Sequence, residues 1–425
     1  MSEWQETDFG RIPREWGLKK VADIKSEDKR AIAMGPFGSN IKAENFIEHG
    51  VPVIRGTNFN FAKYVGGDFV YLTEEKADNL LGSNCKAGDL VFTHRGTIGQ
   101  VGLIPSGKFP RYVISQSGMK LTVNSDLMDS EFLFYFFKSE FGQYQILKYE
   151  SQVGVPSISN PLTSLKEIKV PAPRLPEQKA IAFVLSSLDD KIDLLHRQNQ
   201  TLETMAETLF RQWFVEEAQE NWADTNLGNH TEAHRGLSYK GSGLSDVGNG
   251  LPMHNLNSVY EGGGYKAAGI KYYSGEYKER HIVKPGDIIV ANTEQGHQFR
   301  LIGFPAIVPT SFGERGLFSQ HIYRLVPKPQ SYLTPEYIYH LLMTPIVREK
   351  ITSATNGSTV NMLAIDGLQR PEFKLPPQEK VEKFTMIVKS WWKKKEINQT
   401  QIRTLENLRD KLLPKLMSGE VRVAC

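Results

Sequence analysis

Several short groups of polar residues in this 425-residue chain have the residue types that catalysis or metal binding requires. His230 and His234 stand four residues apart, which places two imidazoles on one face of a helix, as in some zinc sites. Asp89 and Asp287 could act as nuclease carboxylates. Each group is incomplete, because no third metal ligand accompanies the histidines and no Glu-x-Lys partner stands at a useful distance from either aspartate. We therefore expect no catalytic residue and no metal site.

Two further motifs are similar to cofactor-binding segments. Gly262-Gly263-Gly264 lacks the strand-to-helix context of a phosphate-binding loop. Ser159-Asn160-Pro161-Leu162 lacks the second proline and the aromatic residue of the Asn-Pro-Pro-aromatic motif of amino-methyltransferases. We interpret the first as a loop and the second as a turn. No phosphate-binding G-x-x-x-x-G-K-[ST] motif and no H-E-x-x-H motif occurs, so we expect no cofactor.

The composition is that of a globular protein, with 40% hydrophobic and 23% charged residues. The net charge is only +3, from 51 basic and 48 acidic residues, so a basic surface would have to arise by placement. Two cysteines, Cys85 and Cys425, form no metal or disulfide framework. With no signal peptide and no long apolar run, we expect a cytoplasmic protein without a membrane partner.

The positioning of these residues depends on an internal repeat. Leu175-Pro176-Glu177-Gln178 returns as Leu375-Pro376-Pro377-Gln378, an offset of 200 residues (375 minus 175). The order of the matching segments never changes, and a period of this size corresponds to a whole domain with a connector. Similar pairs are Gly50–Val53 with Gly250–Met253, Lys86–Leu90 with Lys284–Ile288, Ile114–Gln116 with Phe318–Gln320, Glu167–Pro171 with Glu372–Pro376, and Thr201–Glu203 with Thr404–Glu406.

The repeat predicts four segments of an α+β protein with an internal pseudo-twofold. Two globular domains of mixed strands and helices cover residues 1–174 and 216–375. Two long connector helices, residues 175–215 and 376–425, follow them and are expected to form an antiparallel coiled coil. The first connector carries a heptad seam with spacings of four and three residues: Ile181, Leu185, Leu188, Ile192, Leu195, Asn199, Leu202, Ala206, Leu209 and Trp213.

Polar residues interrupt both seams. Asn199 could fix the register of the coiled coil from a buried position, or it could lie at an exposed edge. In the second connector Lys395 and Asn398 break the pattern, and Pro414 is expected to end or kink the helix.

The ordered set of motifs resembles the DNA specificity subunit of type I restriction–modification systems. The resemblance covers essentially the whole chain in both copies. It rests on Gly35–Asn40, the Gly-x-Pro segment at 50–54, the Lys-x-Gly-Asp turn, the Ser-Gln pair, the Leu-Pro-x-Gln connector and the tail Leu412–Val421.

This resemblance implies that each globular domain is a target recognition domain for one half of a split DNA sequence. It also implies that the helices set the spacing of the halves and dock two methylation subunits, which motor-nuclease restriction subunits join. The specificity subunit itself would be non-catalytic, with S-adenosylmethionine, ATP and Mg²⁺ belonging to the partners. Two related domains on a spacer suit two half-sites with a fixed gap.

Base-reading residues should lie on loops between strands and carry side chains that reach base edges. In the first domain we predict DNA contacts from Ser39, Asn40, Lys42, Arg55, Thr57, Asn58, Thr93, His94, Arg95 and Gln116. In the second domain we predict them from Arg235, Tyr239, Lys240, His254, Asn255, Asn257, Asn292, Thr293, Gln295, His297, Gln320 and His321. The loop Thr93–Gly96 differs from its match Asn292–Gln295, so an asymmetric target is expected.

Two other functions stay open at this point. The chain could be a fused methyltransferase or restriction enzyme with a cryptic active site, which methyl transfer by the chain alone would reveal. It could also be an interaction scaffold without a DNA target, for which DNA binding would be absent or independent of salt.

Overall fold

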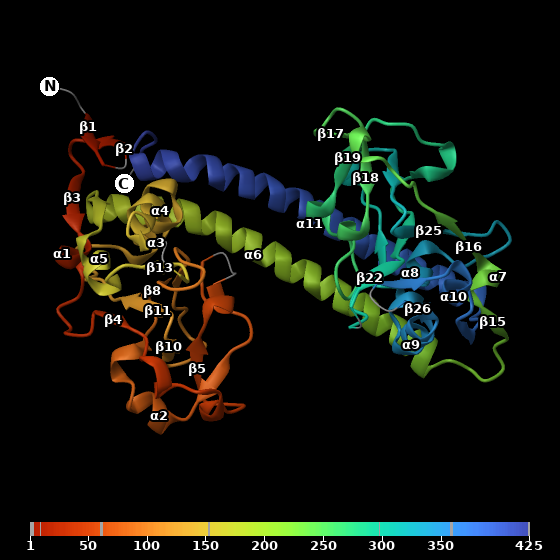
Figure 1. The fold of residues 1–425 in the computed structure, drawn as a ribbon, viewed down its shortest axis with the longest axis horizontal. Coiled ribbons are helices and arrows are strands. Elements are labelled where there is room, and N and C mark those ends of the chain that lie inside the picture. The colour runs from red at the N-terminus through yellow and green to blue at the C-terminus, as the bar shows by residue number, and fades with distance from the viewer. Residues whose placement is uncertain are drawn as a thin grey trace. The chain divides into compact units, whose positions relative to one another are not determined.

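The computed structural model describes residues 4–8, 10–59, 63–151, 154–296, 298–357 and 360–423, without the side chain of Ser39. The chain forms two compact units (Figure 1). Unit 1 consists of Met1–His196 with Gln401–Cys425, and unit 2 consists of Arg197–Thr400. No helix among the described residues is long and apolar enough to cross a membrane.

Unit 1 is built on two four-stranded sheets of short, buried, mostly β-branched and aromatic strands. The first sheet is antiparallel, in the order β4 (Ile32–Met34), β11 (Gly118–Leu121), β8 (Leu90–Thr93) and β9 (Val101–Leu103). The second has the order β6 (Val70–Leu72), β5 (Val51–Ile54), β10 (Tyr112–Ile114) and β7 (Asn84–Cys85). In the second sheet β5 and β10 run parallel, with Val53 opposite Val113.

Smaller elements complete unit 1. Three two-stranded ribbons are β1 (Trp4–Thr7) with β2 (Gly10–Pro13), β3 (Gly17–Lys20) with β14 (Lys169–Ala172), and β12 (Glu150–Ser151) with β13 (Ser157–Ile158). The short helices are α1 (Val21–Ile24), α2 (Glu74–Asp78), α3 (Ser130–Lys138), α4 (Glu140–Leu147) and α5 (Pro161–Glu167).

Helix α3 is the central helix of unit 1, and all six residues from Phe132 to Phe137 are buried. The aromatic-rich residues 130–148 predict a helix with Phe132, Phe136 and Phe137 on one face, whereas the structure has two helices. Ser139 adopts an extended conformation, ends α3 and caps α4 by accepting a hydrogen bond from Gly142 N.

Unit 2 repeats the plan of unit 1 with one additional strand in one sheet and a separate three-stranded sheet. Its antiparallel sheet has the order β16 (Thr231–Arg235), β25 (Ile322–Pro327), β21 (Ile288–Ala291) and β23 (Pro305–Ile307). Its second sheet has the order β17 (Leu244–Ser245), β19 (Lys271–Tyr273), β18 (Leu251–His254), β24 (Gly316–Phe318) and β20 (Ile282–Val283). The remaining elements are β15 (Asp224–Asn226), β28 (Glu372–Lys374), β22 (Thr293–Gln295), β27 (Val360–Leu363), β26 (Thr355–Asn356), α7 (Leu227–His230), α8 (Pro335–Met343), α9 (Pro345–Ser353) and α10 (Ile365–Gln369).

The predicted internal repeat is confirmed by strand pairing. In unit 2 the parallel pair is β18 with β24, and Met253 lies opposite Leu317. The match to Val53 and Val113 in unit 1 has offsets of 200 (253 minus 53) and 204 (317 minus 113), the values of the neighbouring sequence pairs. The predicted α+β class with a repeated domain is therefore confirmed.

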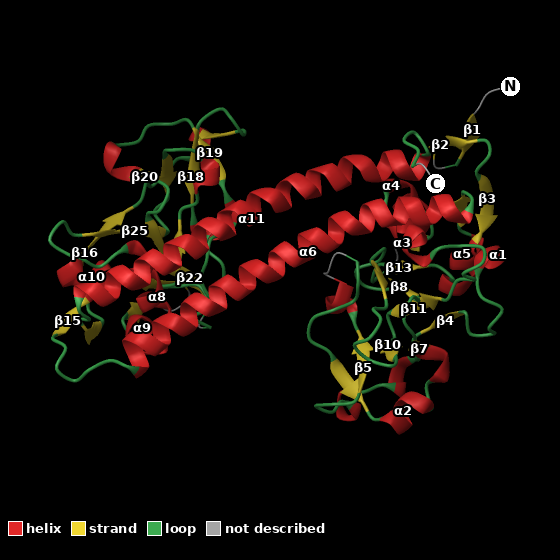
Figure 2. Ribbon diagram, turned by 180° about the vertical axis from the view of Figure 1, so that it is seen from behind, coloured by secondary structure: helices red, strands yellow, loops and turns green. Residues whose placement is uncertain are grey.

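Two long helices, α6 (Leu175–Arg211) and α11 (Gln378–Ser418), contribute to both units (Figure 2). In unit 1, Ile181 and Leu185 of α6 and Leu416 and Met417 of α11 belong to the core around α3. In unit 2, Ala206 and Phe210 of α6 and Val381, Phe384 and Val388 of α11 pack into the core around α8. Each helix is therefore anchored by its apolar face in two separate cores.

Side-chain pairs show that the helices run antiparallel within each unit. In unit 1, Asp189 pairs with Arg409, and Leu195 packs with Ile402. In unit 2, Asn199 Oδ1 accepts a hydrogen bond from Asn398 Nδ2 at 2.9 Å, and Glu203 pairs with Lys395. Asn199 is buried, so of the two positions considered for it the structure selects the buried one.

Of the two outcomes expected for Pro414, an end of the helix is wrong. Pro414 lies inside the helix, which continues to Ser418. Leu416 and Met417, the next apolar residues, are buried in the core of unit 1, and this packing offsets the hydrogen bond that proline cannot donate.

Candidate nucleic-acid interface

The loops that carry the predicted site residues of unit 1 meet at one edge of its sheets. Ser115 N donates to Ile54 O at 2.9 Å, which joins the loop after β10 to the end of β5. His94 N donates to Ser117 O at 2.9 Å, and His94 Nε2 lies 3.2 Å from Gln116 O. Residues that are 61 positions apart in the sequence (115 minus 54) are therefore brought together by a backbone hydrogen bond.

The same edge exists in unit 2. Ser319 N donates to His254 O at 2.9 Å, and Asn292 N donates to His321 O at 3.1 Å. Gln320 N donates to Leu237 O at 3.0 Å, which adds the loop after β16. The loop cluster is thus a repeated feature of the fold.

A glycine allows the closest approach at each edge. A Cβ atom on Gly35 would lie 1.8 Å from Ser115 O, and one on Gly236 would lie 2.1 Å from Ser319 O. Both distances are impossible for real atoms, so only glycine permits this backbone crossing.

Seven of the predicted contact residues are buried and form part of the fold. Asn58 is 1% exposed and donates from Nδ2 to Gly66 O and Asp68 O, while its Oδ1 accepts from Arg55 N. Asn255 is 6% exposed and donates to Gly269 O at 2.6 Å. The buried set is Asn58, Thr93, His94, His254, Asn255, Asn292 and Thr293. Their hydrogen bonds shape the loops, and their side chains have little surface left for contact with a ligand.

Two of these buried side chains are histidines that burial keeps neutral. His254 Nδ1 lies 2.8 Å from the hydroxyl of Tyr265, and burial lowers the pKa of His254 to about 4. Burial also lowers the pKa of His94. Neither imidazole supplies a positive charge for phosphate at neutral pH.

Of the remaining predicted residues whose side chains the structure describes, all but two are exposed. Arg55 and Tyr239 are half-buried, and Lys271 Nζ donates to Tyr239 Oη at 3.3 Å. Ser39 and His297 lie outside the described residues as far as their side chains are concerned. The exposed residues are Asn40, Lys42, Thr57, Arg95, Gln116, Arg235, Lys240, Asn257, Gln295, Gln320 and His321.

The structure also shifts one loop match by a residue. His94 N donates to Ser117 O, and Asn292 N donates to His321 O, so His94 corresponds to Asn292, not to Thr293. Arg95 therefore corresponds to Thr293. Arg95 is exposed, whereas Thr293 is buried with its hydroxyl 3.3 Å from His321 Nδ1. The two edges thus share a backbone and differ in charge.

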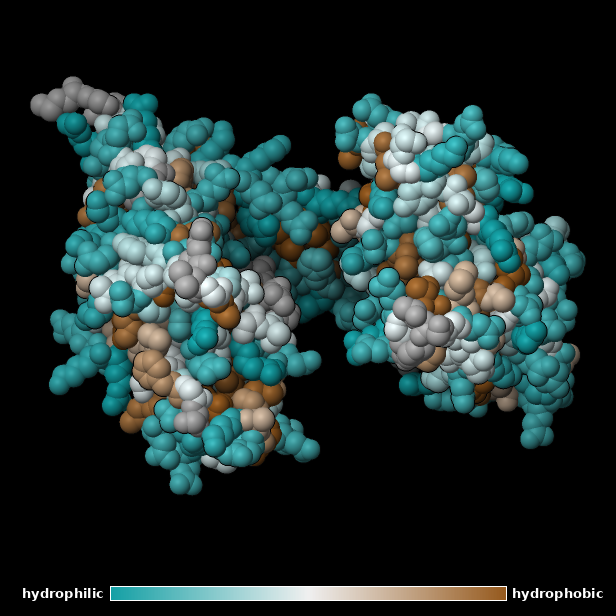
Figure 3. All heavy atoms as spheres, in the orientation of Figure 1, coloured by the Kyte–Doolittle hydropathy of each residue, from teal (hydrophilic) through white to brown (hydrophobic). Residues whose placement is uncertain are grey.

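Among the described residues, no group of three or more His, Cys, Asp or Glu side chains could hold a metal ion. On the face drawn in Figure 3, hydrophilic residues dominate the surface of each unit and hydrophobic residues form small groups. Polar surfaces of this kind are typical of interfaces with DNA.

A comparison with protein families identifies the repeat. The model described as "Type I restriction modification DNA specificity domain" matches twice, at residues 38–204 and 219–407. The chain belongs to this family. The two matches follow the two copies that the strand pairing defines.

One curated relative of the specificity family aligns along nearly the whole chain, and another aligns with part of it. The MjaIX type I restriction enzyme specificity subunit of Methanocaldococcus jannaschii is 25% identical over 446 aligned residues, which cover 99% of this chain and 97% of the relative. The HindI specificity subunit of Haemophilus influenzae is 32% identical over 133 residues, or 31% of this chain. Among solved structures, the type I S subunit from M. genitalium has a TM-score of 0.60 at 17% identity and covers 94% of this chain. That likeness shows the shared fold.

Sequence reasoning missed a set of exposed apolar residues on the long helices of this specificity-family chain. Unit 1 carries Phe183, Leu194 and Leu408, and unit 2 carries Met386, Ile397 and Met205. Each of the three apolar residues on α6 matches one on α11 at an offset of 203. This is also the offset between Thr201 and Thr404 (404 minus 201). The detectable signal was an apolar spacing of 11 residues outside the heptad seam, from 183 to 194 to 205.

Proposed function

We propose that the chain is the DNA sequence-recognition subunit of a type I restriction–modification complex. Each globular domain reads one half of a split, asymmetric target, and the subunit carries out no chemistry itself. The supporting observation is the repeated loop edge, which keeps its hydrogen bonds in both units while its exposed side chains differ. A fixed backbone with variable polar residues is what two different half-sites require.

Within each edge, we propose that the exposed polar residues contact the DNA. Thr57 and Gln116 of unit 1 correspond to Asn257 and Gln320 of unit 2, and all four are exposed. Arg95 adds a positive charge to the edge of unit 1, whereas the matching residue of unit 2, Thr293, is neutral. Arginine favours guanine through its bidentate contacts, so the half-site of the first domain is expected to contain a guanine opposite Arg95.

The first experiment is a map of modified bases in host DNA with and without the gene for this chain. The proposal predicts one split, asymmetric methylated motif that disappears with the gene. Methylation of the same motif in the absence of the gene would contradict the proposal. Binding of oligonucleotides by the chain with its methylation subunits would then show whether it reads DNA at all, and salt-independent binding would argue against phosphate contacts.

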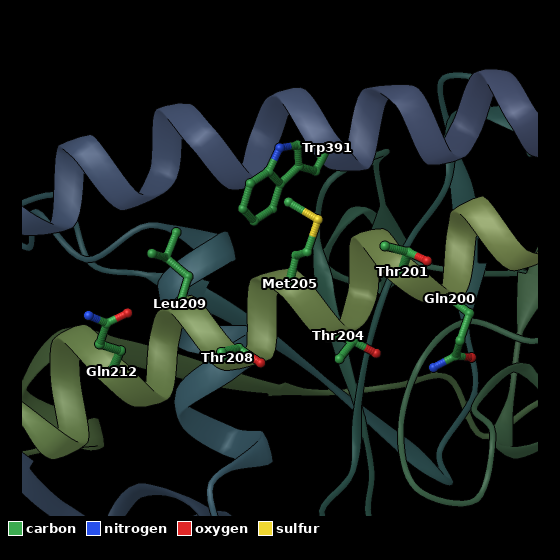
Figure 4. A pocket seen from close by; sticks show the side chains of 8 residues that line it. All are labelled: Gln200, Thr201, Thr204, Met205, Thr208, Leu209, Gln212 and Trp391. Carbon is green, nitrogen blue, oxygen red and sulfur yellow. The ribbon is translucent and has the colours of Figure 1, made fainter.

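We further propose that the exposed apolar sets of α6 and α11 dock the methylation subunits, one on each unit. Phe183 is 72% exposed and its counterpart Met386 is 69% exposed, so the apolar side chains of both sets are accessible to a partner. In unit 2, Met205 reaches toward the indole of Trp391, and both line a groove of about 420 Å³ (Figure 4). The two sets have the same residue spacing, so they suit two copies of one partner.

The docking proposal predicts a change of stoichiometry. Phe183→Asp places a charge in the apolar set of unit 1 and should weaken one of the two partner sites by roughly tenfold or more. Light scattering of the reconstituted complex should then show one methylation subunit where the wild type binds two. Met386→Asp should have the same effect on the other site. His196→Asp, an exposed position on another side of α6, is the matched control, and equal loss with this control would contradict the assignment.

We also propose that the protein acts in the cytoplasm, where its DNA target lies.

We propose that the helices determine the gap between the half-sites. Insertion of one heptad into both α6 and α11 should lengthen the gap and leave both half-site sequences intact. An unchanged gap in the modified-base map would show that the helices are not the spacer.

A further inference from the structure

In unit 2, hydrogen bonds to the backbone amides of the segment 299–302 hold it on one side. The segment 299–302 follows β22 (Thr293–Gln295), the strand that carries the exposed and predicted DNA contact Gln295. The carboxylate of Glu294 accepts hydrogen bonds from three consecutive backbone N–H groups, those of Arg300, Leu301 and Ile302, at 3.0, 2.9 and 2.9 Å. Glu294 is buried, so these bonds form away from competing water.

The carbonyls of the same loop are held from the other side by Arg348 of α9. Its Nη2 donates to Ile302 O at 2.8 Å and to Phe299 O at 3.4 Å. Its Cζ lies 3.5 Å from the centroid of the Phe304 ring, a cation–π contact that fixes the guanidinium. Burial lowers the pKa of Arg348 to about 10, and the side chain therefore remains charged at neutral pH. The loop is clamped between a carboxylate and a guanidinium.

In unit 1, the residue that corresponds to Arg348 also holds the matching loop, but through a neutral side chain. Helices α3 and α8 begin at residues 130 and 335, an offset of 205, and this offset carries Gln143 of α4 onto Arg348. Gln143 Nε2 donates to Gly99 O at 3.0 Å and to Phe137 O at 2.6 Å. The loop Thr93–Gly99 is thus tied to α4 as the segment 299–303 is tied to α9.

A glycine marks the contact in both units. A Cβ on Gly99 would lie 2.9 Å from Gln143 Oε1, and one on Gly303 would lie 2.7 Å from Arg348 Nη1. Both glycines have positive φ, 82° and 77°. Two side chains of different type therefore approach the same backbone position, which indicates that the position of the loop is what the repeat preserves.

We propose that Gln143 and Arg348 are positioning residues for sequence specificity. Each fixes the position of the base-reading loop of its own domain relative to the DNA. This inference rests on the proposed function, because it assumes that these loops face DNA. It goes beyond that function by assigning specificity to residues on helices behind the loops. Arg348 holds its loop with a charged guanidinium, and Gln143 holds its loop with a neutral amide. A substitution of either residue should therefore change the specificity for one half-site only.

The test uses the full chain assembled with its methylation subunits. Arg348→Met removes the hydrogen bonds and keeps much of the side-chain length. Modified-base maps should show relaxed base preference, by about tenfold or more, in the half-site of the second domain only. Arg348→Lys keeps the charge and should recover part of the discrimination. Gln143→Met should relax the other half-site alone. Glu349→Gln, at an exposed neighbouring position of α9, is the control and should change neither half.

Hydrogen exchange of the same variants separates positioning from general unfolding. Arg348→Met should increase the exchange of the amides of residues 300–302 while the core strands β21 and β25 stay protected. Discrimination that stays at the wild-type value in both halves, or relaxes equally in both halves while β21 stays protected, would overturn the inference. If the wild-type complex methylates no split motif, the proposed function fails. The loop clamp is then decided by exchange alone, and unchanged exchange at 300–302 in Arg348→Met would refute it.

Discussion

The two units attach the same helix position to the long helices in different ways. The offset of 205 carries Tyr135 of α3 onto His340 of α8. In unit 1, Tyr135 Oη donates to Asp189 Oδ2 at 2.8 Å, and Asp189 Oδ1 accepts from Arg409 Nη1 at 2.8 Å. In unit 2, the His340 ring stacks between Phe210 and Trp392, with centroids 5.8 and 5.7 Å away and interplanar angles of 21° and 19°.

This difference shows that the repeat preserves the backbone and not the interactions. Unit 1 joins its helices by a buried charge network, in which Asp189 is compensated by one cation and one hydroxyl. Unit 2 joins the same elements by aromatic packing around a neutral imidazole. The two junctions should therefore fail under different conditions, which can be tested in one chain.

The largest effect of a single substitution is expected from the charge network. Arg409→Met leaves the Asp189 carboxylate, with a side chain only 5% exposed, without its cation. Removal of one partner of a buried pair costs about 3 kcal/mol or more. Denaturant unfolding followed by hydrogen exchange should show this loss in unit 1. Lys411→Met, at an exposed position of α11, is the control. Equal destabilisation of unit 2 would contradict the comparison.

Acid should act on unit 2 next. Burial lowers the pKa of His340 to about 4, with a smaller contribution from Lys395, and burial alone lowers that of His254 to about 4. In the unfolded chain both titrate near 6.5, so between these values the unfolded state binds more protons. The stability is complete above about pH 6.5 and decreases as the pH falls toward 4, by about 3 kcal/mol per histidine.

The check is urea unfolding of each unit between pH 7.5 and 4.5, read by hydrogen exchange. His340→Phe keeps the aromatic stack and should remove one part of the acid dependence of unit 2. Unit 1, in which the pKa of His94 is also lowered by burial, should lose less stability. An acid profile of His340→Phe identical to that of the wild type would contradict this account.

A smaller effect is expected from the polar layer between α6 and α11. The offset of 203 carries Asn199 onto Ile402 and Asn398 onto Leu195, and in unit 1 these two apolar residues pack together. Asn398→Leu leaves Asn199 with an unpaired buried amide and should cost about 1–3 kcal/mol. The double variant Asn199→Leu/Asn398→Leu restores a matched apolar layer and should recover the loss. A double variant less stable than either single variant would show that the layer is not an independent pair.

Local patterns made much of the fold predictable. The heptad seam of α6 and the order of the repeated motifs depend on residues close in sequence, and both the repeat and the α+β class were correctly inferred from them. The break between α3 and α4 was missed because a single serine, Ser139, both ends one helix and caps the next. The helix end expected at Pro414 does not occur, because tertiary packing of Leu416 and Met417 outweighs the local preference of proline.

The candidate site was less predictable than the fold. A polar side chain on a loop suggests contact with a ligand. The side-chain amide of Asn58 instead donates hydrogen bonds to Gly66 O and Asp68 O, which lie close to it only in the folded chain. The shift of one residue that pairs His94 with Asn292 is likewise visible only in hydrogen bonds. The boundaries of the four segments and the DNA contacts of the exposed residues stay predictions.

The central claim is that each domain reads its own half of a split target. The most direct test is the modified-base map produced by the complex when Thr57, Arg95 and Gln116 are all replaced by alanine. The account predicts that the half-site of the first domain becomes degenerate or is lost from the recognised motif, while the other half-site keeps its sequence. Loss of sequence preference in both halves, or an unchanged motif, would contradict it.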